Sequence, residues 1–254
     1  MDNSMIDLIG NTPLIKLKYP SELTGCNIYG KAEFMNPGGS VKDRAALGII
    51  QNAEEKKLIE PGGTVVEGTF GNTGIALTMI NNARGYKTII VMPDAASLEK
   101  RDILRNLGAE LRIVEVKPYK DPGNYQHISR QLAEELQAKG EGSVIWANQF
   151  DNTANYQFHA KTTAREIYNQ LDGKVDGFTC AIGTGGTLAG TSVGLKELNP
   201  DIKIACTDPQ GATMYRYFKD SVLEVTGDPS ETEGIGQARV TKNVEACLID
   251  MAYH

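Results

Sequence analysis

The stretch that decides how this chain folds is Asn36-Pro37-Gly38-Gly39-Ser40-Val41-Lys42-Asp43-Arg44, a glycine-rich turn that leads directly into a helix. A helix that begins near Ser40, a good N-cap residue, places the next apolar side chains on one stripe with Lys42. These apolar residues are Ala46, Ile49, Ile50 and Ala53. We therefore expect Lys42 to lie on the buried face of the helix.

Burial of an amine disfavours its charged form, so we expect the pKa of Lys42 to be lowered. A neutral amine can form a Schiff base with an aldehyde cofactor or move a proton. The alternative is a surface lysine whose stem covers apolar groups while its amine stays in water.

Strand and helix patterns alternate along most of the chain. The predicted strands cover residues 27–33, 64–67, 88–92, 110–116, 143–146, 178–182 and 202–207. The predicted helices cover residues 76–84, 97–107, 125–136, 156–171 and 186–198. This alternation predicts an α/β fold in which parallel sheets are covered by helices on both faces.

Composition limits the classes of function. The chain has 254 residues and a net charge of -6, which gives no electrostatic footprint for nucleic acid or an anionic membrane. The four cysteines and three histidines lie far apart in the sequence, so we expect neither a metal site nor a disulfide framework. No signal peptide or transmembrane stretch is recognisable, and we expect a cytoplasmic protein.

Two glycine-rich loops follow predicted strands, where ligands bind in open α/β sheets. The first runs from Glu67 to Gly74 as Glu-Gly-Thr-Phe-Gly-Asn-Thr-Gly and opens a helix whose N-terminus suits an anionic group. The alternative is a tight strand-to-helix turn without a ligand.

The second loop is Gly183-Thr184-Gly185-Gly186-Thr187. Its backbone amides and hydroxyl groups can cradle a phosphate at a helix N-terminus. A dinucleotide fingerprint is the rival interpretation, but the G-x-G-x-x-G pattern fails at Leu188.

Together these motifs resemble those of the cysteine synthase and cystathionine β-synthase family, which are fold-type II pyridoxal-phosphate enzymes similar to the tryptophan synthase β subunit. The resemblance implies two domains, each a mostly parallel sheet covered by helices. The smaller N-terminal domain would span residues 36–146 and carry the lysine and the asparagine loop. The larger domain would combine residues 1–35 with residues 147–254 and carry the phosphate loop.

The resemblance also implies roles for individual residues. Lys42 would hold pyridoxal 5'-phosphate covalently, Asn72 would contact the cofactor ring, and the five residues Gly183, Thr184, Gly185, Gly186 and Thr187 would bind its phosphate. The substrate would be bound by Thr69, Gly71, Thr73, Gln149 and Gly234. Phe70 departs from the small residue that is usual in the family, and we interpret His159 as a structural histidine.

The implied reaction is that of cysteine synthase, in which O-acetylserine and sulfide give cysteine and acetate and Lys42 acts as the general base. Cystathionine β-synthase and β-cyanoalanine synthase chemistry remain alternatives, with serine or O-acetylserine as the amino-acid substrate. The family further implies a homodimer that can bind the C-terminal tail of serine acetyltransferase.

Chains of this family continue for several dozen residues beyond the position of His254. That portion holds the residue that contacts the pyridine nitrogen and the closing elements of the large domain, so we expect the large domain to be C-terminally incomplete. This expectation supports an alternative of a different class, a truncated non-catalytic homologue that acts by protein association.

Overall fold

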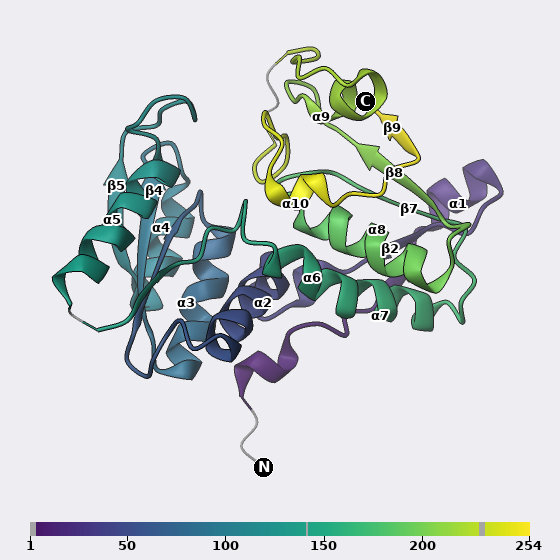
Figure 1. Cartoon of the computed structure of the whole chain (residues 1–254). Coiled ribbons are helices and arrows are strands. Elements are labelled where there is room, and N and C mark those ends of the chain that lie inside the picture. Colours follow the sequence, from purple (N-terminus) through teal and green to yellow (C-terminus); the bar gives the residue numbers. More distant parts are fainter. Residues whose placement is uncertain (1–3, 141, 229–231) are drawn as a thin grey trace.

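The computed structural model describes residues 4–140, 142–228 and 232–254 (Figure 1). The α-helices are α1 (Lys18–Thr24), α2 (Lys42–Glu55), α3 (Asn72–Arg84), α4 (Leu98–Asn106), α5 (Tyr125–Lys139), α6 (Ala154–Lys161), α7 (Thr163–Gln170), α8 (Gly186–Leu198), α9 (Met214–Asp220) and α10 (Lys242–Glu245). The strands are β1 (Leu14–Lys16), β2 (Tyr29–Lys31), β3 (Thr64–Gly68), β4 (Lys87–Pro93), β5 (Glu110–Val114), β6 (Val144–Trp146), β7 (Gly177–Cys180), β8 (Lys203–Thr207) and β9 (Met251–Tyr253). Two short 3-10 helices cover Met5–Leu8 and Glu33–Met35.

Four parallel strands form one sheet in the order β5-β4-β3-β6. Successive side chains of a strand point to opposite faces, and both faces of β3 are buried. Val65 packs with α2 and α3, whereas Val66 packs with α5. Helices therefore cover the two faces of this sheet, as Figure 1 shows on its left side.

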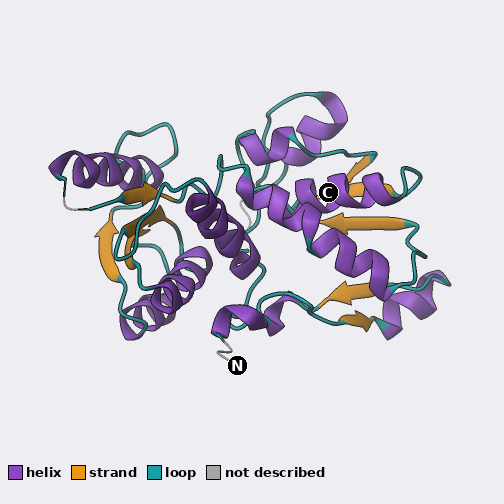
Figure 2. Cartoon of the chain, turned by 60° about the horizontal axis from the view of Figure 1, so that its bottom comes forward, coloured by secondary structure: helices purple, strands orange, loops and turns teal. Residues whose placement is uncertain are grey.

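A second parallel sheet has the order β7-β8-β9, and its core residues pack against α7 and α8. A separate antiparallel pair, β1-β2, lies near β7 (Figure 1). In the described chain, β2 and β7 each have a hydrogen-bonded neighbour on one side alone. Figure 2 shows this block of sheet and helices beside the four-stranded one.

The predicted α/β fold with parallel sheets is confirmed, and most predicted elements are present. One predicted helix is wrong, because residues 156–171 form two helices that meet at Thr162, whose backbone (φ -118°, ψ -72°) interrupts the helix. The N-cap prediction is also wrong, since α2 begins at Lys42 after Val41, and Ser40 Oγ accepts from the Lys42 amide at 3.2 Å. The division into domains at residues 36 and 146 stays a prediction.

Three helices, α2, α6 and α8, pack together through glycines. A Cβ on Gly48 of α2 would collide with Phe158 of α6, and one on Gly190 of α8 would collide with the carbonyl oxygen of Tyr156 of α6. A Cβ on Gly194 would lie 2.5 Å from the carbonyl oxygen of Ala160. Helix α6 thus lies in close contact with the lysine helix on one side and with the helix that follows residues 183–187 on the other.

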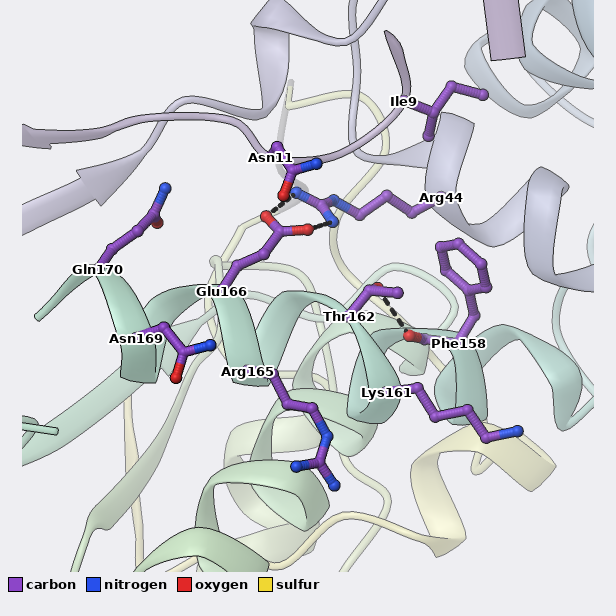
Figure 3. A pocket seen from close by; sticks show the side chains of 10 residues that line it. All are labelled: Ile9, Asn11, Arg44, Phe158, Lys161, Thr162, Arg165, Glu166, Asn169 and Gln170. Carbon is purple, nitrogen blue, oxygen red and sulfur yellow. Dashed lines mark hydrogen bonds and ion pairs between the residues drawn. The ribbon is translucent and has the colours of Figure 1, made fainter. Parts of the chain in front are cut away.

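A buried ion-pair network holds the start of α2. The Arg44 side chain is completely buried, and its guanidinium pairs with Glu33 at 2.7 Å and with Glu166 of α7 at 2.7 Å. Lys31 of β2 pairs with Glu166 at 2.7 Å as well. Figure 3 shows the Arg44 and Glu166 side chains facing each other beside a pocket of about 400 Å³ that Lys42 does not line. The network therefore joins α2 to two segments that lie far from it in the sequence.

We expect Gly190→Ala to lower the free energy of unfolding by about 1–3 kcal/mol because the added methyl group overpacks the contact between α8 and α6. Alanine is the better helix former by about 1 kcal/mol, so a purely local effect has the opposite sign. Urea denaturation measures the change. Glu197→Ala, on the exposed side of the same helix, should change stability by no more than about 0.5 kcal/mol. A Gly190→Ala variant as stable as the parent would contradict the packing argument.

We expect Arg44→Met to destabilise the fold by about 3–5 kcal/mol, because it leaves buried Glu33 and Glu166 without their guanidinium partner. The comparison variant is Arg105→Met, whose pair with Asp102 is exposed and should contribute less than about 1 kcal/mol. Thermal and urea denaturation of both variants provide the measurement. Equal effects at the two positions would show that the buried network does not hold α2.

Candidate functional site

The predicted site residues come together around one cavity of about 370 Å³, which we call the lysine pocket. The predicted residues that line it are Lys42, Thr69, Gly71, Asn72, Thr73, Gln149, Gly183, Thr184 and Gly234. They come from the start of α2, the loop between β3 and α3, the loop after β6, the loop after β7 and the segment near residue 234. Gly185 and Thr187 line an adjoining cavity that also reaches Lys42, whereas Gly186 lines neither.

Lys42 is the first residue of α2 and faces the loop at residues 183–187. A Cβ on Gly183 would lie 4.0 Å from Lys42 Nζ. Burial lowers the pKa of the Lys42 amine, and the positive charge of Lys100 lowers it further, whereas Cys180 opposes the shift. The expected lowering of the lysine pKa thus agrees with the structure. A neutral amine at this place can act as a nucleophile or a base.

The loop at residues 183–187 presents unused donors at the start of α8. Among the described residues, no protein group accepts a hydrogen bond from the backbone amides of Gly183, Thr184 or Gly185. Gly185 has φ +92°, and a Cβ there would lie 2.6 Å from Val244, so the backbone path requires glycine. Amides and hydroxyl groups at a helix N-terminus match the chemistry of a phosphate. The residues present therefore fit an aldehyde that carries a phosphate.

The loop from Thr69 to Thr73 forms another wall of the pocket. Thr69 Oγ1 accepts from the Gly71 amide at 3.1 Å, and the Thr73 hydroxyl donates to Gln149 Oε1 at 2.5 Å. Gln149 Nε2 in turn donates to Glu67 Oε1 at 3.2 Å. Phe70 packs its ring edge to face with Tyr125, with ring centroids 5.4 Å apart, so the unusual aromatic residue becomes part of the pocket wall.

His159 is buried behind the loop at residues 183–187. Its Nδ1 lies 2.8 Å from the Thr163 hydroxyl and its Nε2 lies 3.4 Å from the Thr187 hydroxyl. Burial lowers the pKa of His159 to about 3, and the neighbouring Arg44 charge acts in the same direction. The ring is therefore neutral at physiological pH and can hold Thr187 in place.

Sequence reasoning missed several lining residues of the pocket. Lys100 of α4 forms an ion pair with Glu233 across the pocket, and its stem lies against Gly71, where a Cβ would collide with it. Gln237 Nε2 donates to the Gly183 carbonyl oxygen at 2.9 Å. The remaining missed residues are Tyr125, Gln126, Phe150 and Thr232, whereas Ile235 and Gly236 directly follow the predicted Gly234. Gln237 lies three residues after the predicted Gly234, which is a local signal, whereas nothing in the sequence near Lys100 indicates its position in the pocket.

The adjoining cavity is larger, about 1140 Å³, and we call it the strand-edge cavity because β2 and β7 both line it. Its apolar lining residues include Leu14, Ile28, Ile167, Val175 and Phe178. Lys42 and Gly183 line both cavities, so the strand-edge cavity lies next to the lysine pocket.

The described residues lack two other kinds of feature. They contain no group of three histidine, cysteine or acidic side chains arranged to hold a metal ion. None of their helices is both long and apolar enough to span a membrane.

Comparison with known proteins agrees with this geometry. Residues 5–252 match the family described as "Pyridoxal-phosphate dependent enzyme". Cysteine synthase 1 of Neurospora crassa is 52% identical over 240 residues, which are 93% of this chain and 62% of that protein. Cystathionine beta-synthase of Apis mellifera is 42% identical over 255 residues, which are 97% of this chain and 48% of that protein.

A solved structure of O-ureido-L-serine synthase superposes with a TM-score of 0.85 at 34% identity, covering 99% of this chain and 76% of that one. The chain thus spans less than two thirds of the length of the two curated relatives named above. Over nearly all of its own length, however, sequence and structure agree with one family. The chain belongs to the family of pyridoxal-phosphate-dependent enzymes.

Proposed function

We propose that this chain acts as a cysteine synthase, replacing the acetoxy group of O-acetylserine with sulfide to give cysteine and acetate. The observation that carries the proposal is the meeting of the Lys42 amine with the loop at residues 183–187, 4.0 Å from the Cβ position of Gly183. The proposal is also supported by the named Neurospora relative, which is a cysteine synthase at 52% identity.

The pocket residues divide the work of holding the cofactor. Lys42 would hold pyridoxal 5'-phosphate through its amine. The amides of Gly183, Thr184 and Gly185, with Gly186 and Thr187 at the start of α8, would hold its phosphate, and Asn72 would contact its ring. When bound, the cofactor supplies an electron sink for the bonds at the substrate α-carbon. Lys42, with its lowered pKa, supplies the base that takes the α-proton.

The substrate carboxylate is assigned to the opposite wall. Thr69, Gly71 and Thr73 precede or begin α3, whose N-terminal dipole favours an anion. Gln149, which accepts a hydrogen bond from Thr73, and Gly234 also line this pocket. Lys100 and Glu233, which form an ion pair with each other, line this pocket as well.

Two alternatives to cysteine synthase activity each have an observation in their favour. The Apis relative supports cystathionine β-synthase chemistry, in which serine is the amino-acid substrate, and β-cyanoalanine synthase differs again in the nucleophile. The strand-edge cavity is lined by β2 and β7, and each of these strands has one edge without a hydrogen-bonded neighbour in the described chain. This feature supports a non-catalytic homologue that acts by protein association.

The proposed function extends to the compartment, the oligomeric state and the partner of the protein. We infer a cytoplasmic homodimer that can bind the C-terminal tail of serine acetyltransferase, as the family resemblance implies. The division into a smaller domain of residues 36–146 and a larger domain of residues 1–35 and 147–254 agrees with the way the two parallel sheets divide the chain.

We expect the purified protein to develop the visible absorption of lysine-bound pyridoxal phosphate, and this absorption to change when O-acetylserine is added. Lys42→Ala should abolish the lysine-bound absorption and lower cysteine formation by at least about 10²-fold, because the variant lacks both the attachment point and the base. Lys56→Ala, at the exposed end of α2, should leave both measurements unchanged.

Absorption that persists in Lys42→Ala would contradict the lysine assignment. Absorption that never responds to O-acetylserine, serine or sulfide would instead favour the non-catalytic alternative.

A further inference from the structure

The side-chain amide of Gln149 has a defined orientation in the wall of the lysine pocket. Its Nε2 faces two acceptors, Glu67 Oε1 at 3.2 Å and the Gly68 carbonyl oxygen at 3.4 Å. Its Oε1 accepts from the Thr73 hydroxyl at 2.5 Å. The Glu67, Thr73 and Gln149 residues are each 3% exposed or less, so these bonds are shielded from water.

This orientation leaves neither Thr73 nor the Gln149 amide with a hydrogen for a carboxylate. A threonine hydroxyl has one hydrogen, and that of Thr73 is already given to Gln149. Both hydrogens of the Gln149 amide lie on the side of Glu67 and Gly68. A carboxylate only accepts hydrogen bonds, so it cannot bind to Thr73 in this arrangement.

Half a turn of the Gln149 amide reverses the pattern. Nε2 would then donate to Thr73 Oγ1, and the Thr73 hydrogen would become free to point into the pocket. Oε1 would meanwhile face both the Gly68 carbonyl oxygen and Glu67, and an ionised Glu67 offers only lone pairs and repels it. A protonated Glu67 instead carries a hydrogen that it can donate to Oε1.

We propose that Glu67 is a proton-operated positioning residue: its protonation turns the Gln149 amide and thereby lets Thr73 donate to the α-carboxylate of an amino-acid substrate. This inference rests on the proposed function for the place of the substrate carboxylate, but it concerns only protein groups. It predicts that carboxylate affinity falls when Glu67 becomes ionised.

The surroundings of Glu67 bring the loss of its proton into a pH range in which the protein can be studied. Burial raises the pKa of Glu67 to about 8, although hydrogen bonds from Gln149 and from the backbone of Asn148 and Gly68 oppose the shift. The titratable group that faces it from α5 is the Tyr125 phenol, whose pKa is raised to about 12 by burial and then by Glu67. On the adjacent strand β4 its register partner is apolar Ile90. The other ionisable side chains of the lysine pocket are Lys42, Lys100 and Glu233.

The test compares acetate binding to the cofactor-loaded parent and to Glu67→Gln by calorimetry between about pH 6 and about pH 9.5. Glutamine keeps an N–H that can face Gln149 Oε1 at every pH, so the variant should behave like the protonated parent. We expect the ratio of parent to variant affinity to be constant below about pH 8 and to fall about tenfold for each further pH unit. Because Lys42, Lys100, Glu233 and Tyr125 are present in both proteins, the ratio isolates Glu67.

Glu55→Gln is the matched control, since it makes the same substitution at an exposed position on α2 and should follow the parent throughout. An affinity ratio that stays constant over the whole range would overturn the proposal. A second measurement needs no folded variant: the infrared band of a buried protonated carboxyl group in the parent should disappear at the pH where acetate affinity breaks. Its absence at neutral pH, or its loss at a different pH, would overturn the proposal too.

These outcomes are separate from those of the proposed function. Acetate binding that follows the predicted pH dependence in a protein that never turns over O-acetylserine would support the role of Glu67 while refuting cysteine synthase activity. Normal turnover with a constant affinity ratio would do the opposite.

Discussion

The guanidinium of Arg44, buried between Glu33 and Glu166, is the constraint on which the site depends. Burial acts to raise the pKa of Glu166, but hydrogen bonds from Arg44 and Lys31 lower it to about 2, so the carboxylate remains charged across the physiological range. A buried charge cluster contributes little net stability, yet removing one member leaves the others uncompensated. Lys42 lies two residues before Arg44 on the same helix. The ion pairs of Arg44 therefore also fix the position of Lys42 in the pocket wall.

Local patterns carried most of what could be read from the sequence. The apolar stripe behind Lys42 and the glycines at residues 183–187 are short-range signals of helix faces and of close backbone approach. The pairing of Arg44 with Glu166 joins residues 122 positions apart, and nothing near either residue indicates it. The break at Thr162 and the three-residue strand β9 were missed for a related reason, since tertiary contacts and not local propensity decide them.

The lysine pocket separates two kinds of electrostatic environment. On the phosphate side, the backbone amides of residues 183–185, which have no acceptor among the described residues, offer donors without extra charge, and the neutral His159 ring lies behind Thr187. On the carboxylate side, every hydrogen of the Gln149 amide and the Thr73 hydroxyl is committed to another protein group. The phosphate side is therefore ready for an anion as it stands, whereas Thr73 and Gln149 on the other side can donate to one only after their hydrogen bonds rearrange. This asymmetry implies that binding of the substrate carboxylate depends more strongly on pH than binding of the cofactor phosphate does.

Helix α6 has a mechanical consequence of its own. Glycines of α2 and α8 bring their backbones against it, so backbone groups of α6 and the Phe158 side chain set its spacing from these two helices. Interiors packed in this way have low compressibility, because there are few voids to collapse. Hydrostatic pressure and thermal expansion act first on loosely filled regions such as the strand-edge cavity. Helix α6 therefore acts as a rigid spacer. The distance that it sets between α2 and α8 should change little when the volume of other parts of the molecule changes.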